Sequence, residues 1–163
     1  MGEARSRAAR HTARLATVAL VRSGSRVLLL RHPPQSDRFA GRWNGIGGHV
    51  EAGEGLRAAA RRELREESGL DVRSLRLRGV VHETGLRGHA YVVFFFVGEV
   101  ASPELAPAAG VELAWHELAS VRDLPLVDDL HELLDILLAN REPALAVERF
   151  DGGDGQIAFA WDE

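Results

Sequence analysis

Residues 48–70 read GHVEAGEGLRAAARRELREESGL, and this stretch decides how the whole chain is interpreted. Its part from residue 55 to residue 68 is dense in Ala, Leu, Glu and Arg, which favour the α-helix. Gly69 follows at the position where helices commonly end in a left-handed conformation, which glycine adopts without strain. The stretch therefore predicts a helix over residues 55–68.

The predicted helix gathers carboxylates on one face. At about 100° per residue, Glu63 and Glu67 fall within one narrow arc, and Glu66 lies on its flank. Glu63 and Glu67 form a like-charge pair four residues apart, which destabilises a helix by about 0.2–0.5 kcal/mol. The arginines occupy another side of the helix, at Arg57, Arg61 and Arg65. Something other than the arginines must offset the repulsion.

Two interpretations of this carboxylate face are open. A divalent cation would offset the repulsion, because Mg²⁺ prefers carboxylate oxygens and commonly bridges them to substrate phosphates. The alternative is a solvated acidic face, since most charge runs are solvated. The glycines near the helix favour a ligand site, because backbone without a Cβ atom can approach a metal ion or phosphate closely. They are Gly41, Gly45, Gly47, Gly48, Gly53 and Gly55.

Composition excludes several other functions. The chain has no cysteine, which excludes disulfides, thiolate catalysis and Cys-ligated metals. All 20 basic residues are arginine, which excludes a P-loop lysine and a Schiff-base lysine. The net charge of −4 argues against a nucleic-acid polymer as partner, and no apolar run approaches the ~20 residues that cross a membrane. We therefore expect a soluble, cytoplasmic protein.

The 163 residues fit one domain. We expect a flexible tail over residues 1–14, which carry arginines but precede no signal-like apolar segment, and a single domain over residues 15–163. Apolar and β-branched runs between turn residues predict the strands, and leucines at helical spacing predict a second helix. The expected elements are a hairpin over 15–30, a loop over 31–48, strands over 75–83, 89–100, 111–116 and 156–161, and a helix over 130–139.

Taken together, residues 48–70 resemble the Nudix box. Its pattern is Gly, five residues, Glu, seven residues, Arg-Glu, an aliphatic residue, any residue, Glu-Glu, any residue, Gly and an aliphatic residue. Every fixed position is matched at this spacing, which makes the resemblance highly specific. The matching residues are Gly48, Glu54, Arg62, Glu63, Leu64, Glu66, Glu67, Gly69 and Leu70.

The resemblance implies an α/β/α sandwich with a mixed central sheet, and Mg²⁺-dependent hydrolysis of a diphosphate linked to another group. Mn²⁺ is expected to substitute for Mg²⁺. The implied metal ligands are Glu63, Glu66, Glu67 and the Gly47 carbonyl. Glu54 and Arg62 are similar to the pair that braces loop against helix, next to Gly48.

In the implied chemistry, the cations make a water more acidic and a carboxylate takes its proton. Glu63 and Glu66 are both candidates for that base. Relatives often supply one more glutamate shortly before the tryptophan that matches Trp115, where this chain has Ala109 and Gly110. Glu112 is the nearest substitute, although a solvent-facing strand residue is the favoured interpretation.

Two further segments bear on the substrate. Residues 41–48 (GRWNGIGG) and the pair Asp128-Asp129 resemble the segments with which MutT-like triphosphatases of oxidised purines hold a base. Asn44 can donate and accept hydrogen bonds to a purine. Asp129 also fits a capping box with Glu132, so Asp128 is the better recognition candidate. The aromatic residues expected beside the base are missing, because Glu83 and Gly85 stand near those positions.

These residues lead to one expected function and two alternatives. The leading expectation is hydrolysis of a nucleoside triphosphate of the 8-oxo-dGTP type to nucleoside monophosphate and pyrophosphate. A second enzyme interpretation replaces this substrate by a nucleotide sugar, a dinucleoside polyphosphate or a nucleoside diphosphate. A third is a non-catalytic nucleotide-binding domain, against which the complete set of box carboxylates counts.

Overall fold

The computed structural model describes residues 11–36, 39–86, 88–139, 144–150 and 157–161. The strands are β1 (Arg14–Ser23), β2 (Arg26–Arg31), β3 (Trp43–Asn44), β4 (Ile46–His49), β5 (Leu75–Leu86), β6 (His89–Glu99), β7 (Glu112–Glu117), β8 (Ala144–Phe150) and β9 (Ile157–Trp161). The helices are α1 (Leu56–Ser68), the short 3₁₀ helix η1 (Val121–Asp123) and α2 (Asp128–Leu138). Residues 1–10 of the expected tail lie outside the described part of the chain.

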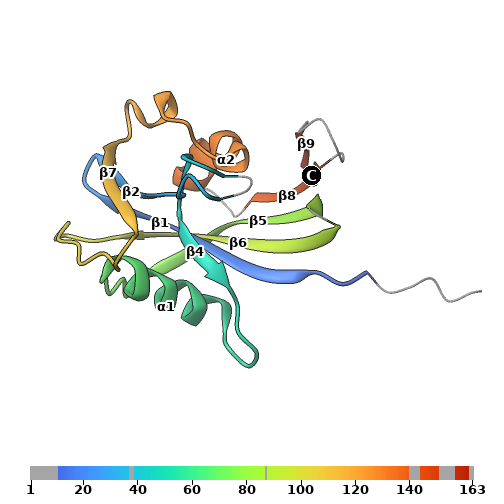
Figure 1. The fold of residues 1–163 in the computed structure, drawn as a ribbon, viewed down its shortest axis with the longest axis horizontal. Coiled ribbons are helices and arrows are strands. Elements are labelled where there is room, and N and C mark those ends of the chain that lie inside the picture. Colours follow the sequence, from blue (N-terminus) through green and yellow to red (C-terminus); the bar gives the residue numbers. More distant parts are fainter. Residues whose placement is uncertain (1–10, 37–38, 87, 140–143, 151–156, 162–163) are drawn as a thin grey trace, which may run out of the picture.

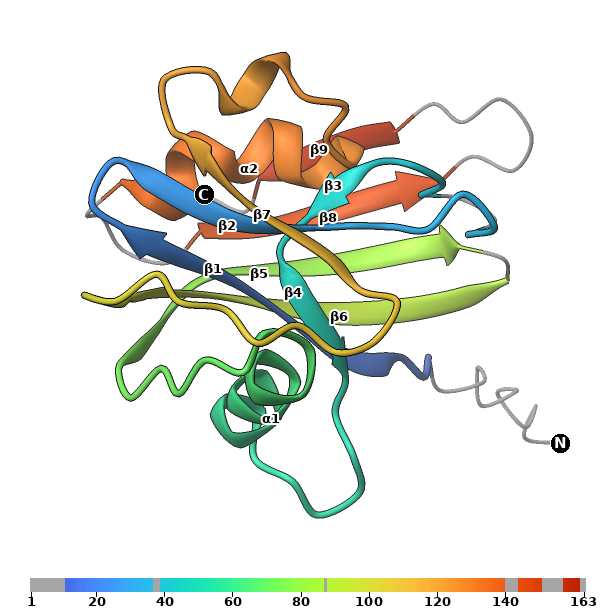
Figure 2. The same cartoon turned by 60° about the vertical axis from the view of Figure 1, so that its left-hand side comes forward.

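The strands form one mixed sheet, which confirms the predicted fold class. Its order is β3-β2-β1-β6-β5-β8-β9, with β4 also paired to β1 and β7 to β2. The β1–β6 and β5–β8 pairs are parallel, whereas β1–β2 and β5–β6 are antiparallel. Helix α1 covers one face of the sheet and α2 the other, giving three layers (Figures 1 and 2). None of the described helices is long and apolar enough to span a membrane.

Alternation along the strands divides the core into two halves, one on each face of the sheet. In β1, Ala19 and Val21 pack with Leu64 of α1, whereas Leu20 packs on the opposite side with the leucines of α2. Successive residues of a strand point to opposite faces, so an uninterrupted apolar run supplies both halves. Phe95 in β6 is likewise fully buried. These central strands form the platform that positions the two helices.

The predicted turns and helix end are present. Gly24 has a φ of 61° in the turn that joins β1 to β2, where Ser23 pairs with Arg26. Gly69 follows α1 with a φ of 74°, and its N–H donates to the carbonyl of Arg65 at 3.0 Å. Both positions need the left-handed conformation that glycine supplies.

Several expected boundaries are wrong. The loop predicted over 31–48 contains β3 and β4, because pairing with β1 and β2 makes strands of a glycine-rich segment. Strand β8 was not predicted at all, and it is paired in parallel with β5. Helix α2 begins at Asp128, two residues early, because acidic residues are favourable in the first turn of a helix. Each difference comes from a tertiary pairing or a helix-end effect that local spacing does not contain.

Candidate active site

Strand β4 brings the backbone of the Nudix-like box against β1 and α1. Gly47 and Gly48 pair with Val18 and Thr17 of β1. A Cβ atom on Gly47 would collide with the Thr17 carbonyl, so only glycine fits there. A Cβ atom on Gly48 would lie 2.6 Å from Cδ of Glu63, so the carboxylate of Glu63 sits directly over this glycine. The missing side chains create the space that the glutamate occupies.

Arg62 joins the loop before α1 to the helix itself. Its Nε and Nη2 donate to the two carboxylate oxygens of Glu54 at 3.0 and 3.1 Å, in a paired geometry that is stronger and more directional than one bond. Nη2 also donates to the His49 carbonyl at 3.1 Å. The guanidinium lowers the pKa of Glu54 below its usual range, and its carboxylate partners raise the pKa of Arg62. Both charges therefore persist at neutral pH.

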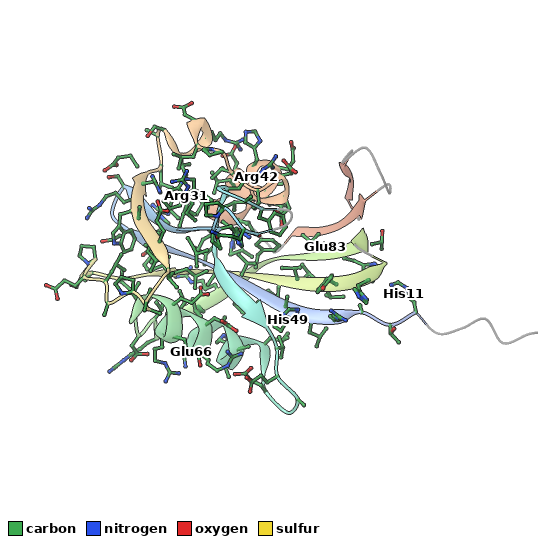
Figure 3. All side chains as sticks on the ribbon, in the orientation of Figure 1. His11, Arg31, Arg42, His49, Glu66 and Glu83 are labelled. Atoms are coloured by element: carbon green, nitrogen blue, oxygen red, sulfur yellow. The ribbon has the colours of Figure 1, made fainter. Side chains whose placement is uncertain are left out.

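The same arginine restrains two further glutamates on α1. Arg62 Nη1 donates to Glu63 Oε1 at 2.8 Å and to Glu66 Oε2 at 3.1 Å. The Glu63 side chain is only 14% exposed, whereas that of Glu66 is 58% exposed and is labelled on the outer side of the helix in Figure 3. Glu63 is therefore fixed in place, and Glu66 is the carboxylate with room to move.

Glu67 is the carboxylate that the protein leaves unsatisfied. Burial, together with the negative charges of Glu63 and Glu66, raises the pKa of Glu67 to about 7. Its Oε2 is buried and accepts no hydrogen bond from the described residues. Burying a carboxylate without a partner is costly, and a bound cation would supply the missing partner. The donor set around Glu67 therefore fits a divalent metal ion.

The carboxylates do not yet form a closed metal site. Among the described residues, no three histidine or acidic side chains converge tightly enough to hold an ion as they stand. The three glutamates are also bonded differently, because Arg62 donates to Glu63 and Glu66, whereas Oε2 of Glu67 has no hydrogen-bond partner among the described residues. Arg62 engages one oxygen each of Glu63 and Glu66, so the other carboxylate oxygens are not used by this arginine.

Glu112 at the start of β7 pairs with an arginine of the neighbouring strand. It is exposed and its Oε1 is 3.3 Å from Arg31 Nη1 on β2. Leu113 and Trp115 of the same strand pack into the core half under α1. Successive strand residues point to opposite faces, so Glu112 points to the face opposite to that of Leu113. This agrees with the interpretation of Glu112 as a solvent-facing strand residue.

The segments proposed to hold a base meet on the α2 side of the sheet. The backbone of Trp43 in β3 is bonded on both sides to the segment before α2, through Pro125 O at 2.9 Å and Val127 N at 2.9 Å. Asn44 follows Trp43 in the sequence, and Asp128 follows Val127. The pairing of Trp43 with Val127 therefore brings the two segments together. The structure thus brings together residues that lie more than eighty positions apart.

Asn44 and Asp128, the two residues predicted to recognise a base, each have a polar partner within the protein. Asn44 Oδ1 accepts from the N–H of Gly45 at 2.7 Å. Asp128 forms an ion pair with Arg42, a residue that sequence reasoning did not single out. Arg42 lies in the same GRWNGIGG segment as Asn44. Its positive charge, and the negative charges of Asp128 and Asp129, were the sequence signal for this ion pair. The Asp128 side chain is still 48% exposed and can contact a ligand.

The capping box suggested for Asp129 is not formed. Val127 is the N-cap residue of α2, so Asp129 lies inside the first turn, where its Oδ1 accepts from the Leu130 N–H at 2.8 Å.

Glu83 is 8% exposed in β5, directly opposite Tyr91 of β6. Tyr91 packs against the α2-side core, so Glu83 places a buried carboxyl on the same side of the sheet as α2.

The two groups of residues lie on opposite faces of the sheet and are joined by one short segment. Figure 3 shows Glu66 on the α1 side and Arg42 on the α2 side. Residues 43–49 pass between them, with Asn44 in β3 and Gly47 in β4. Because β4 pairs with β1 and β3 pairs with β2, this segment lies where β1 and β2 separate, and β7 covers the other side of β2.

Sequence comparison finds relatives of this chain among characterised proteins. An oxidized purine nucleoside triphosphate hydrolase of Mus musculus is 45% identical over 94 residues, which are 58% of this chain and 50% of that protein. The chain spans about half the length of the first curated relatives that it matches.

Solved structures share the fold. The MutT protein of Bacillus halodurans has a TM-score of 0.77 at 22% identity, covering 91% of this chain and 97% of that chain. The NUDIX domain of Shewanella oneidensis NrtR, solved with ADP ribose, has a TM-score of 0.65 at 22% identity, covering 80% and 90%. The family model of the NUDIX domain matches residues 11–150, from before β1 to the end of β8. The match extends over both faces of the sheet, and the chain therefore belongs to the Nudix hydrolase family.

Proposed function

We propose that this chain is a Mg²⁺-dependent pyrophosphohydrolase that converts nucleoside triphosphates to nucleoside monophosphate and pyrophosphate, with oxidised purine nucleotides as its preferred substrates. The observation that carries the proposal is the buried, unpartnered Oε2 of Glu67 beside Glu63 and Glu66. Mg²⁺ is the favoured ion because it binds through a few carboxylates plus substrate phosphates. Mn²⁺ is expected to replace it, since both prefer oxygen ligands.

The chain's own residues would divide the work of hydrolysis. Glu63, Glu66, Glu67 and the Gly47 carbonyl would hold the metal, which when bound neutralises diphosphate oxygens and makes the attacking water more acidic. Glu63 or Glu66 would accept the proton of that water. Arg62 would keep both carboxylates near the reacting bond through the hydrogen bonds it already makes.

Residues on the α2 side would choose the base. Asn44 can offer its amide N–H groups, because its Oδ1 already accepts from Gly45. Asp128 would contact the base while Arg42 fixes its position, and Asp129 would contribute from the next position in α2. The similarity to the mouse oxidized purine nucleoside triphosphate hydrolase supports this substrate class.

A second substrate class is a nucleoside diphosphate derivative such as a nucleotide sugar. Two observations favour it as the alternative. Glu83 places a buried carboxyl where an aromatic residue was expected, and carboxyl oxygens suit sugar hydroxyl groups better than the face of a base. The neighbouring NrtR domain is solved with ADP ribose.

A panel of substrates separates these proposals. Purified protein is incubated with Mg²⁺ and with 8-oxo-dGTP, dGTP, ADP-ribose, a nucleotide sugar or a dinucleoside polyphosphate, and the products are identified by chromatography. We expect monophosphate and pyrophosphate from 8-oxo-dGTP, with kcat/KM at least about tenfold above that for dGTP. Faster cleavage of the sugar derivatives would replace the substrate class. No turnover of any compound would indicate a non-catalytic nucleotide-binding domain.

A further inference from the structure

A pocket of about 360 Å³ lies at the C-terminal end of α2, where the ends of β1 and β6 meet the beginning of β5. Its charged residues are Arg22 of β1, Arg76 and Arg78 of β5, and Glu99 of β6. Three arginines against one glutamate form a local positive surplus in a chain whose net charge is −4. None of the residues assigned to hydrolysis or base recognition lines this pocket.

The register of the strands directs Arg22 and Arg76 to the same face of the sheet. Leu20 of β1 and Val97 of β6 are paired, and both pack on the α2 side. Arg22 follows Leu20 by two residues, and Arg76 lies directly opposite Val97, so both arginines share that face. Only β6 separates their strands, at about 5 Å per strand, so both guanidinium groups can reach one ligand.

Arg78 has a different task in this pocket. It stands at the irregularity between Leu77 and Gly79 in β5 and donates to the carbonyls of Leu137 and Ala139 at the end of α2. The carbonyl end of a helix carries partial negative charge, which would repel an anion. Arg78 offsets that charge and leaves the other two arginines to set the local potential.

Arg22 and Arg76 carry positive charge that their protein neighbours match poorly. Arg22 Nε is buried and has no hydrogen-bond acceptor within the described chain. Its Nη1 lies 3.9 Å from a carboxylate oxygen of Glu99, whose side chain is 75% exposed. Arg76 is exposed and has no ion pair with any residue that the structure describes. A buried N–H without an acceptor is costly, and a bound anion would supply the acceptor.

We propose that this pocket binds a small molecule carrying a phosphate group, with the phosphate held between Arg22 and Arg76. The planar guanidinium group presents paired donors that match phosphate oxygens. Val97 and Leu137 form apolar parts of the lining, and the volume lies within the range of small-molecule sites. A phosphate monoester with an apolar group therefore fits this pocket better than inorganic phosphate does.

Binding is tested on the full chain in EDTA, so that the α1 glutamates hold no metal and repel anions. Inorganic phosphate, phenyl phosphate and benzoate are titrated by calorimetry and by amide NMR shifts. We expect saturable one-to-one binding of both phosphates, tighter for phenyl phosphate, and weaker binding of benzoate. The amides of Ser74 and Gly98 should shift, and those of Gly47 and Gly48 should not.

Matched variants decide whether the two arginines hold the ligand. Arg22→Gln/Arg76→Gln should weaken phenyl phosphate binding by about tenfold or more, since charge-assisted hydrogen bonds are lost. Arg73→Gln removes one charge from a side chain that is 92% exposed and outside the pocket, and should bind like wild type. Arg76→Gln alone serves if the double variant fails to fold.

Three results would overturn the proposal: no saturable binding of either phosphate, unchanged affinity in the double variant, or amide shifts confined to the α1 side. Equal affinity for the two phosphates would overturn the apolar part of the site. The hydrolytic assay depends on a metal and on different residues. The phosphate-binding result can therefore be interpreted even if no hydrolysis is found.

Discussion

Gly48 and Glu63 are complementary in shape: the carboxylate of Glu63 occupies the space that a side chain on Gly48 would fill. The contact joins β4 to α1 and fixes one glutamate of the acidic helix face relative to the backbone of the preceding strand. Arg62 also holds this carboxylate, through a 2.8 Å hydrogen bond from Nη1 to Oε1 of Glu63. Glu63 is therefore positioned twice, by a missing Cβ atom and by a guanidinium group.

Gly48→Ala should displace the Glu63 carboxylate with little loss of stability, because the atoms that must move are the end of a flexible side chain. We expect activity to fall about 10–100-fold, as for other changes that misplace a metal ligand. Steady-state kinetics with Mg²⁺ and thermal unfolding measure the two effects. Gly55→Ala is the control, because a Cβ atom there meets nothing within 4 Å and φ is −80°. Equal activity of both variants would contradict the positioning role of Gly48.

Glu67→Gln should stabilise the metal-free protein at pH 8 while abolishing most turnover. The folded-state pKa of Glu67, about 7, lies above the ordinary glutamate value of 4.5. The folded protein therefore holds the extra proton between these values, and its stability falls as pH rises through that window. The variant removes this penalty, so its unfolding temperature in EDTA should exceed that of wild type at pH 8 and equal it near pH 4.5. Lower stability of the variant at pH 8 would show that Glu67 has a protein partner.

The affinity for Mg²⁺ should rise with pH through the same window, because a proton and a cation compete for Glu67. We expect the apparent affinity to increase by up to about tenfold per pH unit below pH 7 and to level off above it. Calorimetric titrations at pH 6, 7 and 8 measure the effect. In Glu67→Gln the residual affinity should depend much less on pH, and an unchanged slope would assign the proton to another group.

Arg62→Lys should lower kcat even though it keeps the positive charge. A lysine ammonium cannot make the two parallel bonds to Glu54 while also reaching Glu63 and Glu66. We expect kcat to fall about 10–100-fold, as is typical when the partners of metal ligands are lost. Arg57→Lys provides the control on an exposed part of the same helix. Wild-type kcat in Arg62→Lys would mean that charge alone suffices.

Asp128→Asn should alter the choice of base more than the rate of hydrolysis. The change weakens the ion pair with Arg42 and replaces an acceptor oxygen with a donor at the α2 end of the site. We expect the ratio of kcat/KM for 8-oxo-dGTP and dGTP to change by about tenfold or more, with kcat on the better substrate within a fewfold of wild type. Asp123→Asn, exposed on η1, is the matched control. An equal loss on every substrate would indicate that Asp128 is structural.

The acidic helix and its end at Gly69 were predictable because their signals are local: helix-forming residues, i to i+4 spacing and a C-cap glycine. The hairpin at Gly24 was predictable for the same reason. Strand β3 was not, because its two residues are held by partners in β2 and in the segment before α2, far away in sequence. The Arg42–Asp128 ion pair depends on that same long-range contact.

The orphaned oxygen of Glu67 also could not be foreseen. Spacing places Glu63, Glu66 and Glu67 on one side of a helix, but it does not say which of them Arg62 will engage. These contacts depend on tertiary packing, in which Glu63 lies over Gly48 of β4 and Oε2 of Glu67 is buried without a hydrogen-bond partner among the described residues. Sequence therefore identified the set of glutamates, and the structure shows how differently they are bonded.

The short run from β3 to β4 connects the two faces of the sheet within six residues of chain, Asn44 to His49. The residues proposed to recognise the base and the proposed metal ligands lie on different elements, with Asn44 in β3 and Asp128 in α2, and the glutamates in α1. New specificity could evolve by altering the Asn44 and Asp128 end while the glutamate helix stays intact. A laboratory redesign of this scaffold would begin at the same place.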